Sequence, residues 1–151
     1  MFARTVSNEI YSWGQNNLGQ LGRGFVSSNY EKPSKISALD GKQIINISCG
    51  SDHCLALTSN GDVYGWGSNS YGQVGCKSTN DKISSPVLIE IKNTCNINCF
   101  GLYSFTIDFN GKISYWGKMM TYFAYFLKHW RKTIIFSNFQ LFRNFNYYHW
   151  I

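Results

Sequence analysis

Two side chains that could carry nucleophilic chemistry, His53 and Cys54, stand next to each other in the sequence. A histidine that shares a hydrogen bond with a thiol can activate it as a nucleophile. The apolar residues around this pair alternate, which is typical of a strand. Adjacent residues of a strand point to opposite faces of the sheet, so the two side chains cannot meet directly. The pair therefore does not predict a catalytic site.

The other candidates for chemistry are isolated. The chain has five cysteines, an odd number that argues against a closed disulfide framework, and no Cys-x-x-Cys pair or histidine pair at zinc spacing. The glycines at 65, 67, 72 and 75 match neither the dinucleotide-binding nor the Walker spacing. We therefore predict no catalytic residue, no metal, no cofactor and no enzyme in its own right. The cysteines and the isolated turn acids are Cys49, Cys54, Cys76, Cys95, Cys99, Asp52, Asp62 and Asp108.

The start of the chain has no apolar segment of the kind found in secretory signals. Unpaired cysteines fit a reducing compartment. The sequence thus predicts a cytoplasmic or nuclear protein that is not secreted.

A repeated stretch organises the chain. Trp66 to Gly75 reads WGSNSYGQVG, and Trp13 to Gly22 reads WGQNNLGQLG. A third, partial copy begins at Trp116, so the three tryptophans are spaced 53 and 50 residues apart. Because about 50 residues make one blade of a β-propeller, the chain is best interpreted as a repeat protein.

Each repeat also contains the signal of a β-hairpin. Asn60-Gly61 and Asn110-Gly111 each separate two runs of alternating apolar residues. Asn-Gly favours a type I′ turn, in which both central residues have positive φ. We expect a hairpin at each place, with the Trp-Gly motif at the end of its second strand.

The rest of the repeat region predicts an antiparallel meander without helices. We expect strands at 2–6 and 10–14, a glycine-rich loop at 15–25 and a polar linker at 27–33. Short strands should start at 33–36 and 85–88, with further apolar strands at 43–49 and 89–91.

The pattern Cys-Gly-x-x-His-x-x-Ala-Leu, Asn-Gly and Trp-Gly-x-Asn-x-x-Gly-Gln-apolar-Gly resembles the repeat of the regulator-of-chromosome-condensation family. The resemblance covers residues 2–117 and implies an all-β fold, a partial β-propeller of two to three antiparallel blades. It implies structural roles for the repeat residues, with the tryptophans in the core, the asparagines bonded to loop backbone and the histidine as a hydrogen-bonding residue. The signature residues are Trp13, Gly14, Asn16, Gly19, Gln20, Gly22, Gly50, His53, Gly61, Trp66, Gly67, Asn69, Gly72, Gln73, Gly75, Gly111, Trp116 and Gly117.

The same resemblance suggests two functions. Members of the family are propellers of about seven blades, and the type member is the nucleotide exchange factor for the nuclear GTPase Ran. The chain is thus expected to be a non-catalytic protein-interaction propeller, from an exchange factor or regulator of a Ran-type small GTPase. The alternative is a partner-binding propeller of a ubiquitin-ligase or ciliary scaffold without exchange activity. Either function implies a protein partner and no small-molecule substrate or membrane, and leaves nucleic acid or chromatin open.

Residues 118–151 do not continue the repeat and read as an irregular aromatic and basic tail. Twelve of these 34 residues are aromatic, and all six surplus charges behind the net charge of +6 lie between Lys112 and Arg143. An amphipathic membrane-surface helix and an aromatic nucleic-acid platform are alternatives. We favour a segment outside the evolved fold, such as a retained intron or frameshift. A chain of 151 residues is then a propeller fragment, expected to aggregate or oligomerise through open strand edges.

Overall fold

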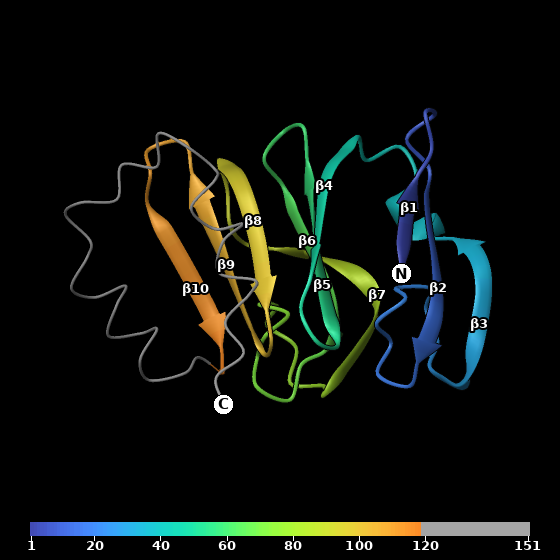
Figure 1. Ribbon diagram of the computed structural model, residues 1–151. Helices are drawn as coiled ribbons and strands as arrows, with labels where there is room; N and C mark the ends of the chain where they lie inside the picture. Colours follow the sequence, from blue (N-terminus) through green and yellow to red (C-terminus); the bar gives the residue numbers. More distant parts are fainter. Residues whose placement is uncertain (119–151) are drawn as a thin grey trace, which may run out of the picture. The chain divides into compact units, whose positions relative to one another are not determined.

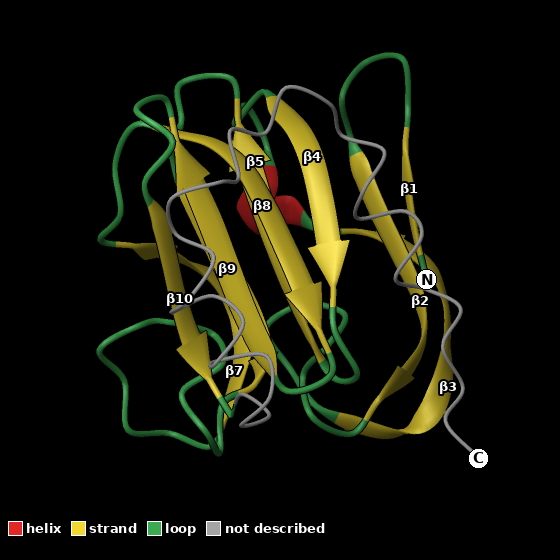
Figure 2. Cartoon of the chain, turned by 60° about the vertical axis from the view of Figure 1, so that its left-hand side comes forward, coloured by secondary structure: helices red, strands yellow, loops and turns green. Residues whose placement is uncertain are grey.

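The computed structural model describes residues 1–118, which form ten β-strands in three antiparallel sheets (Figure 1). Among these residues the one helical element is a single 3₁₀ turn, η1, drawn in red in Figure 2. The all-β prediction is therefore confirmed. The interpretations of the tail beyond Lys118 lie outside the described residues.

Each sheet is a meander in which consecutive strands pair. The first contains β1 (Phe2–Arg4), β2 (Ile10–Asn16) and β3 (Ser27–Lys35), and η1 (Ser37–Leu39) follows it. The second contains β4 (Ile44–Cys49), β5 (His53–Thr58), β6 (Val63–Ser68) and β7 (Lys82–Ile89). The third contains β8 (Thr94–Phe100), β9 (Tyr103–Asp108) and β10 (Ile113–Gly117).

The two expected hairpins are present, but their turns are not of type I′. Gly61 has a φ of 83°, whereas positive φ among the described non-glycine residues occurs only at Asn8, Gln43 and Asn93. The Gly61 amide donates to the Thr58 carbonyl at 3.1 Å. This is a type I turn that ends in a left-handed glycine, a common geometry of longer hairpin loops. The second hairpin repeats it, with Gly111 donating to Asp108.

The outer strands differ most from the sequence-based expectation. The stretch predicted as a polar linker, 27–33, forms most of β3, which ends at Lys35 rather than starting near Pro33. Strand β7 likewise begins at Lys82, three residues before the predicted start, and it ends at Ile89. None of the residues of β3 is fully buried, and such an exposed edge strand needs no apolar alternation and can hold a proline. The polar sequence of β3 therefore could not be told apart from that of a loop.

Two apolar clusters fill the spaces between neighbouring sheets. One joins the first and second sheets and contains Ile10, Ile36, Leu39, Ile44, Cys54, Ala56 and Trp66. The other joins the second and third sheets and contains Leu55, Leu57, Val63, Ile89, Ile97 and Cys99. Strand β5 contributes alternate residues to both clusters, and all six of its residues are buried. The second sheet thus has a neighbour on each face, as an inner blade of a propeller does. None of the described residues forms a helix long and apolar enough to cross a membrane.

Candidate functional site

His53 lies at the start of β5, and its ring points across to the third sheet. Its Nε2 is 2.8 Å from Oγ of Ser104 on β9. The Ser104 hydroxyl in turn donates to the carbonyl oxygen of Gln73 at 2.8 Å. These two hydrogen bonds link β5 and β9 to the loop that follows β6, at the boundary between two sheets.

A histidine beside a serine raises the question of nucleophilic catalysis, and the direction of the hydrogen bonds answers it. Because the Ser104 hydroxyl gives its proton to Gln73, Nε2 of His53 must donate to Ser104 and cannot accept that proton. Both side chains are fully buried. Burial lowers the pKa of His53 to about 4, so the ring is neutral near pH 7. The pair is a buried structural link between sheets.

Trp116 completes this link. Its indole Nε1 donates to the same Gln73 carbonyl at 2.9 Å. A Cβ added to Gly75 would lie 2.5 Å from that nitrogen, so the indole packs directly on the glycine backbone. We call this group, Gln73, Gly75, Ser104, Trp116 and His53, the second clasp.

The same arrangement occurs one repeat earlier. Trp66 Nε1 donates to the Gln20 carbonyl at 3.0 Å, and Cys54 Sγ lies 3.8 Å from that oxygen. A Cβ on Gly22 would lie 2.9 Å from Trp66 Nε1. We call Gln20, Gly22, Cys54 and Trp66 the first clasp. In both clasps a tryptophan of one sheet holds a loop of the preceding sheet.

Each loop is also fixed from within by its own asparagine. Asn16 Oδ1 accepts the amide of Leu21 at 3.1 Å, and Asn69 Oδ1 accepts the amide of Val74 at 3.2 Å. The amide nitrogen of Asn16 donates to the Phe25 carbonyl, so both ends of the side chain hold the loop. These bonds place the Gln20 and Gln73 carbonyls where the tryptophans can reach them.

The other signature residues lie in turns and close approaches. Gly61 and Gly111 close hairpins, and Gly14, Gly67 and Gly117 have positive φ near the ends of β2, β6 and β10. A Cβ on Gly50 would overlap the ring of His53. Trp66 is 0% exposed, but Trp13 and Trp116 are only half-buried. Of the three tryptophans predicted as core residues, Trp66 alone is fully buried, and Trp116 packs against the second apolar cluster.

The cysteines bring together no reactive site among the described residues. All five are free, and no group of three His, Cys, Asp or Glu there could hold a metal ion. Burial raises the pKa of the Cys99 thiol to about 12 and that of Cys54 well above its usual range. Both thiols are therefore protonated and poor nucleophiles. Cys49, directly opposite Cys54 on β4, is exposed.

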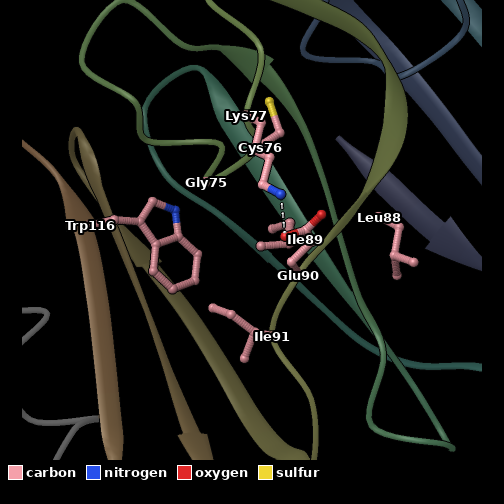
Figure 3. Close-up of a pocket in the computed structure, with 8 residues that line it drawn as sticks. All are labelled: Gly75, Cys76, Lys77, Leu88, Ile89, Glu90, Ile91 and Trp116. Carbon is pink, nitrogen blue, oxygen red and sulfur yellow. Dashed lines mark ion pairs between the residues drawn. The ribbon is translucent and has the colours of Figure 1, made fainter.

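One cleft of about 340 Å³ lies beside the second clasp (Figure 3). Its lining is largely apolar, with an exposed ion pair of 2.7 Å between Lys77 and Glu90 at its side. The lining residues are Gly75, Cys76, Lys77, Leu88, Ile89, Glu90, Ile91 and Trp116. Sequence reasoning missed both this cleft and Ser104. The 50-residue repeat could have found Ser104, since it occupies the position of Cys54 in the third repeat.

The comparisons with known proteins agree with this geometry. The family model described as "Regulator of chromosome condensation (RCC1) repeat" matches residues 7–57 and 60–98. The Protein RCC2 homolog of Xenopus laevis is 35% identical over 115 residues, 75% of this chain and 22% of that protein. The E3 ubiquitin-protein ligase HERC2 of Homo sapiens is 47% identical over 73 residues, 48% of this chain and 2% of that protein. The chain thus spans less than a quarter of either relative.

Among solved structures, Prp20p from Saccharomyces cerevisiae, a protein with binding properties to Gsp1p and histones, is similar with a TM-score of 0.69 and 26% identity. The match covers 77% of this chain and 30% of Prp20p. The repeat model covers more than half of the chain, and the three sheets have the order of propeller blades. The chain therefore belongs to the regulator of chromosome condensation (RCC1) repeat family, and its sheets are β-propeller blades.

Proposed function

We propose that this chain is part of a non-catalytic protein-interaction propeller that regulates a Ran-type small GTPase. The observation that carries the proposal is the use of the polar signature groups inside the blades. His53, Ser104 and the Gln73 carbonyl are buried and bonded to one another, so they are not free to act on a substrate. Binding then falls to the exposed loops, as is usual for propellers.

Two loops are suited to such binding. The segments 17–26 and 69–81 connect the last two strands of the first and second blades, and Figure 1 draws both at the lower end of the sheets. Their bases are fixed by Asn16 and Asn69, while their tips are exposed. Tyr71 is 50% exposed, and Lys118 Nζ lies 4.5 Å from the centre of its ring. A rigid loop with an exposed aromatic tip is typical of a protein-binding surface.

Support for the GTPase as partner comes from the family. The type member exchanges nucleotide on Ran, and the similar Prp20p binds Gsp1p and histones. We expect the full chain to bind a nucleotide-free Ran-type GTPase and to accelerate release of a fluorescent GDP analogue from the loaded GTPase. Tyr71→Ala should weaken binding, whereas Tyr30→Ala, on the 82% exposed tyrosine of β3, should not. A folded chain that neither binds the GTPase nor accelerates release would contradict the proposal.

The second candidate is a partner-binding propeller without exchange activity, as in a ubiquitin-ligase or ciliary scaffold. The 47% identity to HERC2 favours it over the 73 matched residues. The two candidates differ in one measurement, because a scaffold would bind its partner while leaving the rate of nucleotide release unchanged.

A further inference from the structure

Two cysteines face each other across the paired strands β4 and β5. Cys49 ends β4, Cys54 is the second residue of β5, and the two are directly opposite in the antiparallel register. Opposite residues of a sheet share a face. Here it is the face toward the first blade, because Cys54 belongs to the apolar cluster on that side. All five cysteines of the chain lie within the described residues, so no thiol outside them could compete for either partner.

The backbone hydrogen bonds of this hairpin place the two thiols close together. The Gly50 amide donates to the His53 carbonyl at 2.9 Å, so Gly50 and His53 form a hydrogen-bonded pair. Because bonded and non-bonded pairs alternate, the next pair, Cys49 and Cys54, is non-bonded, and the Cα atoms of such a pair are about 4.5 Å apart. A disulfide can span this separation. The Cys49 thiol is also within hydrogen-bonding reach of the Cys54 thiol.

The two thiols differ in their access to solvent. Cys54 is 3% exposed, and burial raises the pKa of its thiol well above the usual range. Cys49 is exposed. A reagent in solution therefore meets Cys49, while burial shields Cys54 from it. An exposed thiol next to a buried one is the arrangement of an attacking and a resolving cysteine.

A third cysteine, Cys99 on β8, lies on the other face of the second sheet. Its thiol donates to the Ser48 carbonyl at 3.3 Å, and its amide donates to the Ser48 hydroxyl at 2.9 Å. The Ser48 side chain thus points toward the third blade. Adjacent residues of a strand point to opposite faces, so the Cys49 side chain points away from Cys99. The geometry therefore selects Cys54 as the partner of Cys49.

We propose that Cys49 and Cys54 form a reversible thiol–disulfide site that reacts with a small disulfide such as glutathione disulfide. The Cys49 thiolate attacks one sulfur of glutathione disulfide, which forms a mixed disulfide and releases one glutathione with the proton that Cys49 lost. The Cys54 sulfur then attacks the Cys49 sulfur, which forms the protein disulfide and releases the second glutathione with the Cys54 proton. The two cysteines are oxidised by two electrons, and glutathione disulfide is reduced to two thiols.

The same site belongs to the first clasp. The Cys54 thiol donates to the Gln20 carbonyl, 3.8 Å from its sulfur, and Cys54 is directly opposite Trp66 on β6. A disulfide sulfur carries no hydrogen, so oxidation removes this donor, while the Trp66 indole still donates to the same oxygen. The redox state of the two cysteines therefore acts on the joint between the first and second blades.

The test incubates the full folded chain with glutathione disulfide, followed by intact mass and peptide mapping. The natural chain should gain one bridge between Cys49 and Cys54, with the loss of two hydrogens, and dithiothreitol should reverse it. Cys49→Ser should form no bridge. Cys54→Ala should stop at a mixed disulfide of glutathione and Cys49, because the resolving thiol is gone.

Cys95 is the matched control within the chain. It is exposed on β8, at a bulge where the opposite residues of β9 are Ile107 and Asp108. Cys95 should therefore take up glutathione and keep it, and Cys95→Ser should leave the bridge between Cys49 and Cys54 unchanged.

The indole protons report on the clasps. In NMR spectra of the oxidised chain, the resonance of the Trp66 indole proton should shift. That of Trp116 should not, because its clasp contains Ser104 in place of Cys54. The same treatment of Cys49→Ser should shift neither. None of these readouts involves a GTPase, so this inference goes beyond the proposed function and fails independently of it.

Four results would overturn the inference. The first is glutathione on Cys95 without any bridge between Cys49 and Cys54. The second is a bridge from Cys49 to Cys99. The third is a bridge that forms only when urea has unfolded the chain. The fourth is a bridge that leaves the Trp66 indole resonance in place, which would separate the site from the first clasp.

Discussion

The two clasps place the same groups in two different surroundings. In each, an indole N–H bonds a glutamine carbonyl of the preceding blade, at 3.0 Å from Trp66 and 2.9 Å from Trp116. In each, the indole packs on a glycine of that loop. In the first clasp Trp66 is 0% exposed and packs among apolar side chains, and Gly24 of its loop donates a backbone hydrogen bond to Ser84 of β7. The second clasp stays half-open at Trp116 and compensates with a polar chain through His53 and Ser104.

The comparison teaches that the repeat signature fixes the joint between blades but not its stability. The indole bond depends on residues within the signature, whereas burial of the indole depends on the apolar cluster packed around it. Differences in the strength of the two clasps should therefore follow burial and the second polar donor, which is Cys54 in one clasp and Ser104 in the other.

The largest expected effect is the loss of an indole. Trp66→Ala should lower the free energy of unfolding by about 3–5 kcal/mol, as for other buried tryptophans. Trp116→Ala should cost clearly less, because part of its surface is already in water. Urea unfolding of the full chain at low protein concentration measures both. Equal losses would show that the two clasps are enclosed to the same extent, which would break the comparison.

The next effect is a pH dependence that belongs to the second clasp. The pKa of His53 is about 4 in the folded chain, against 6.5 for a histidine in water. The unfolded chain therefore takes up the proton first, and stability present above pH 6.5 is lost as the pH falls toward 4. The loss amounts to about 3 kcal/mol. Between pH 7.5 and 4 the urea midpoint of the natural chain should decrease as the pH is lowered, and that of His53→Asn should decrease less. Parallel plots of midpoint against pH for the two chains would contradict the prediction.

A smaller effect separates steric contact from backbone strain. Gly75 and Gly72 have similar φ values of 82° and 71°. An alanine at either position pays for the left-handed backbone, about 1–2 kcal/mol, but only at position 75 does the new methyl group meet Trp116. Gly75→Ala should thus cost about 1–3 kcal/mol more than Gly72→Ala. If both variants unfold at the same urea concentration, the indole does not press on this loop in solution.

The smallest effect converts one clasp into the other. Ser104→Cys replaces the 2.8 Å hydrogen bond from the Ser104 hydroxyl to the Gln73 carbonyl with a thiol contact. The equivalent thiol, that of Cys54, has its sulfur 3.8 Å from the Gln20 carbonyl. We expect a loss of about 1 kcal/mol, the usual net value of one hydrogen bond. Cys54→Ser should cost more, about 1–3 kcal/mol, because it places a hydroxyl among apolar side chains without a close acceptor. Thermal unfolding of both variants against the natural chain would detect a reversed order, which would contradict this assignment.

The sequence predicted the parts of the fold that have strong local patterns. The repeat of Trp-Gly motifs located the blades, and Asn-Gly located both hairpins, because a left-handed turn residue needs glycine. It did not predict β3, since an exposed outer strand requires neither apolar alternation nor the absence of proline. Nor did it predict the turn type, which depends on the length of the hairpin loop as well as on Asn-Gly.

The candidate site was predicted in part. His53 was expected to have a hydrogen-bonding role, but its partner Ser104 lies 51 residues away in the next repeat. The clasps depend on the backbone carbonyls of Gln20 and Gln73, and the type of a residue says nothing about where its carbonyl points. Sequence reasoning also placed Trp116 in the core, whereas its side chain is half-buried at the side of the second apolar cluster.

The central claim, that buried signature groups join neighbouring blades, is tested most directly by a double-mutant cycle between His53 and Ser104. The two residues belong to different blades and meet through one hydrogen bond of 2.8 Å. Urea unfolding of His53→Ala, Ser104→Ala and the double variant should give a coupling energy of about 0.5–3 kcal/mol. Single losses that simply add, with no coupling, would contradict the claim.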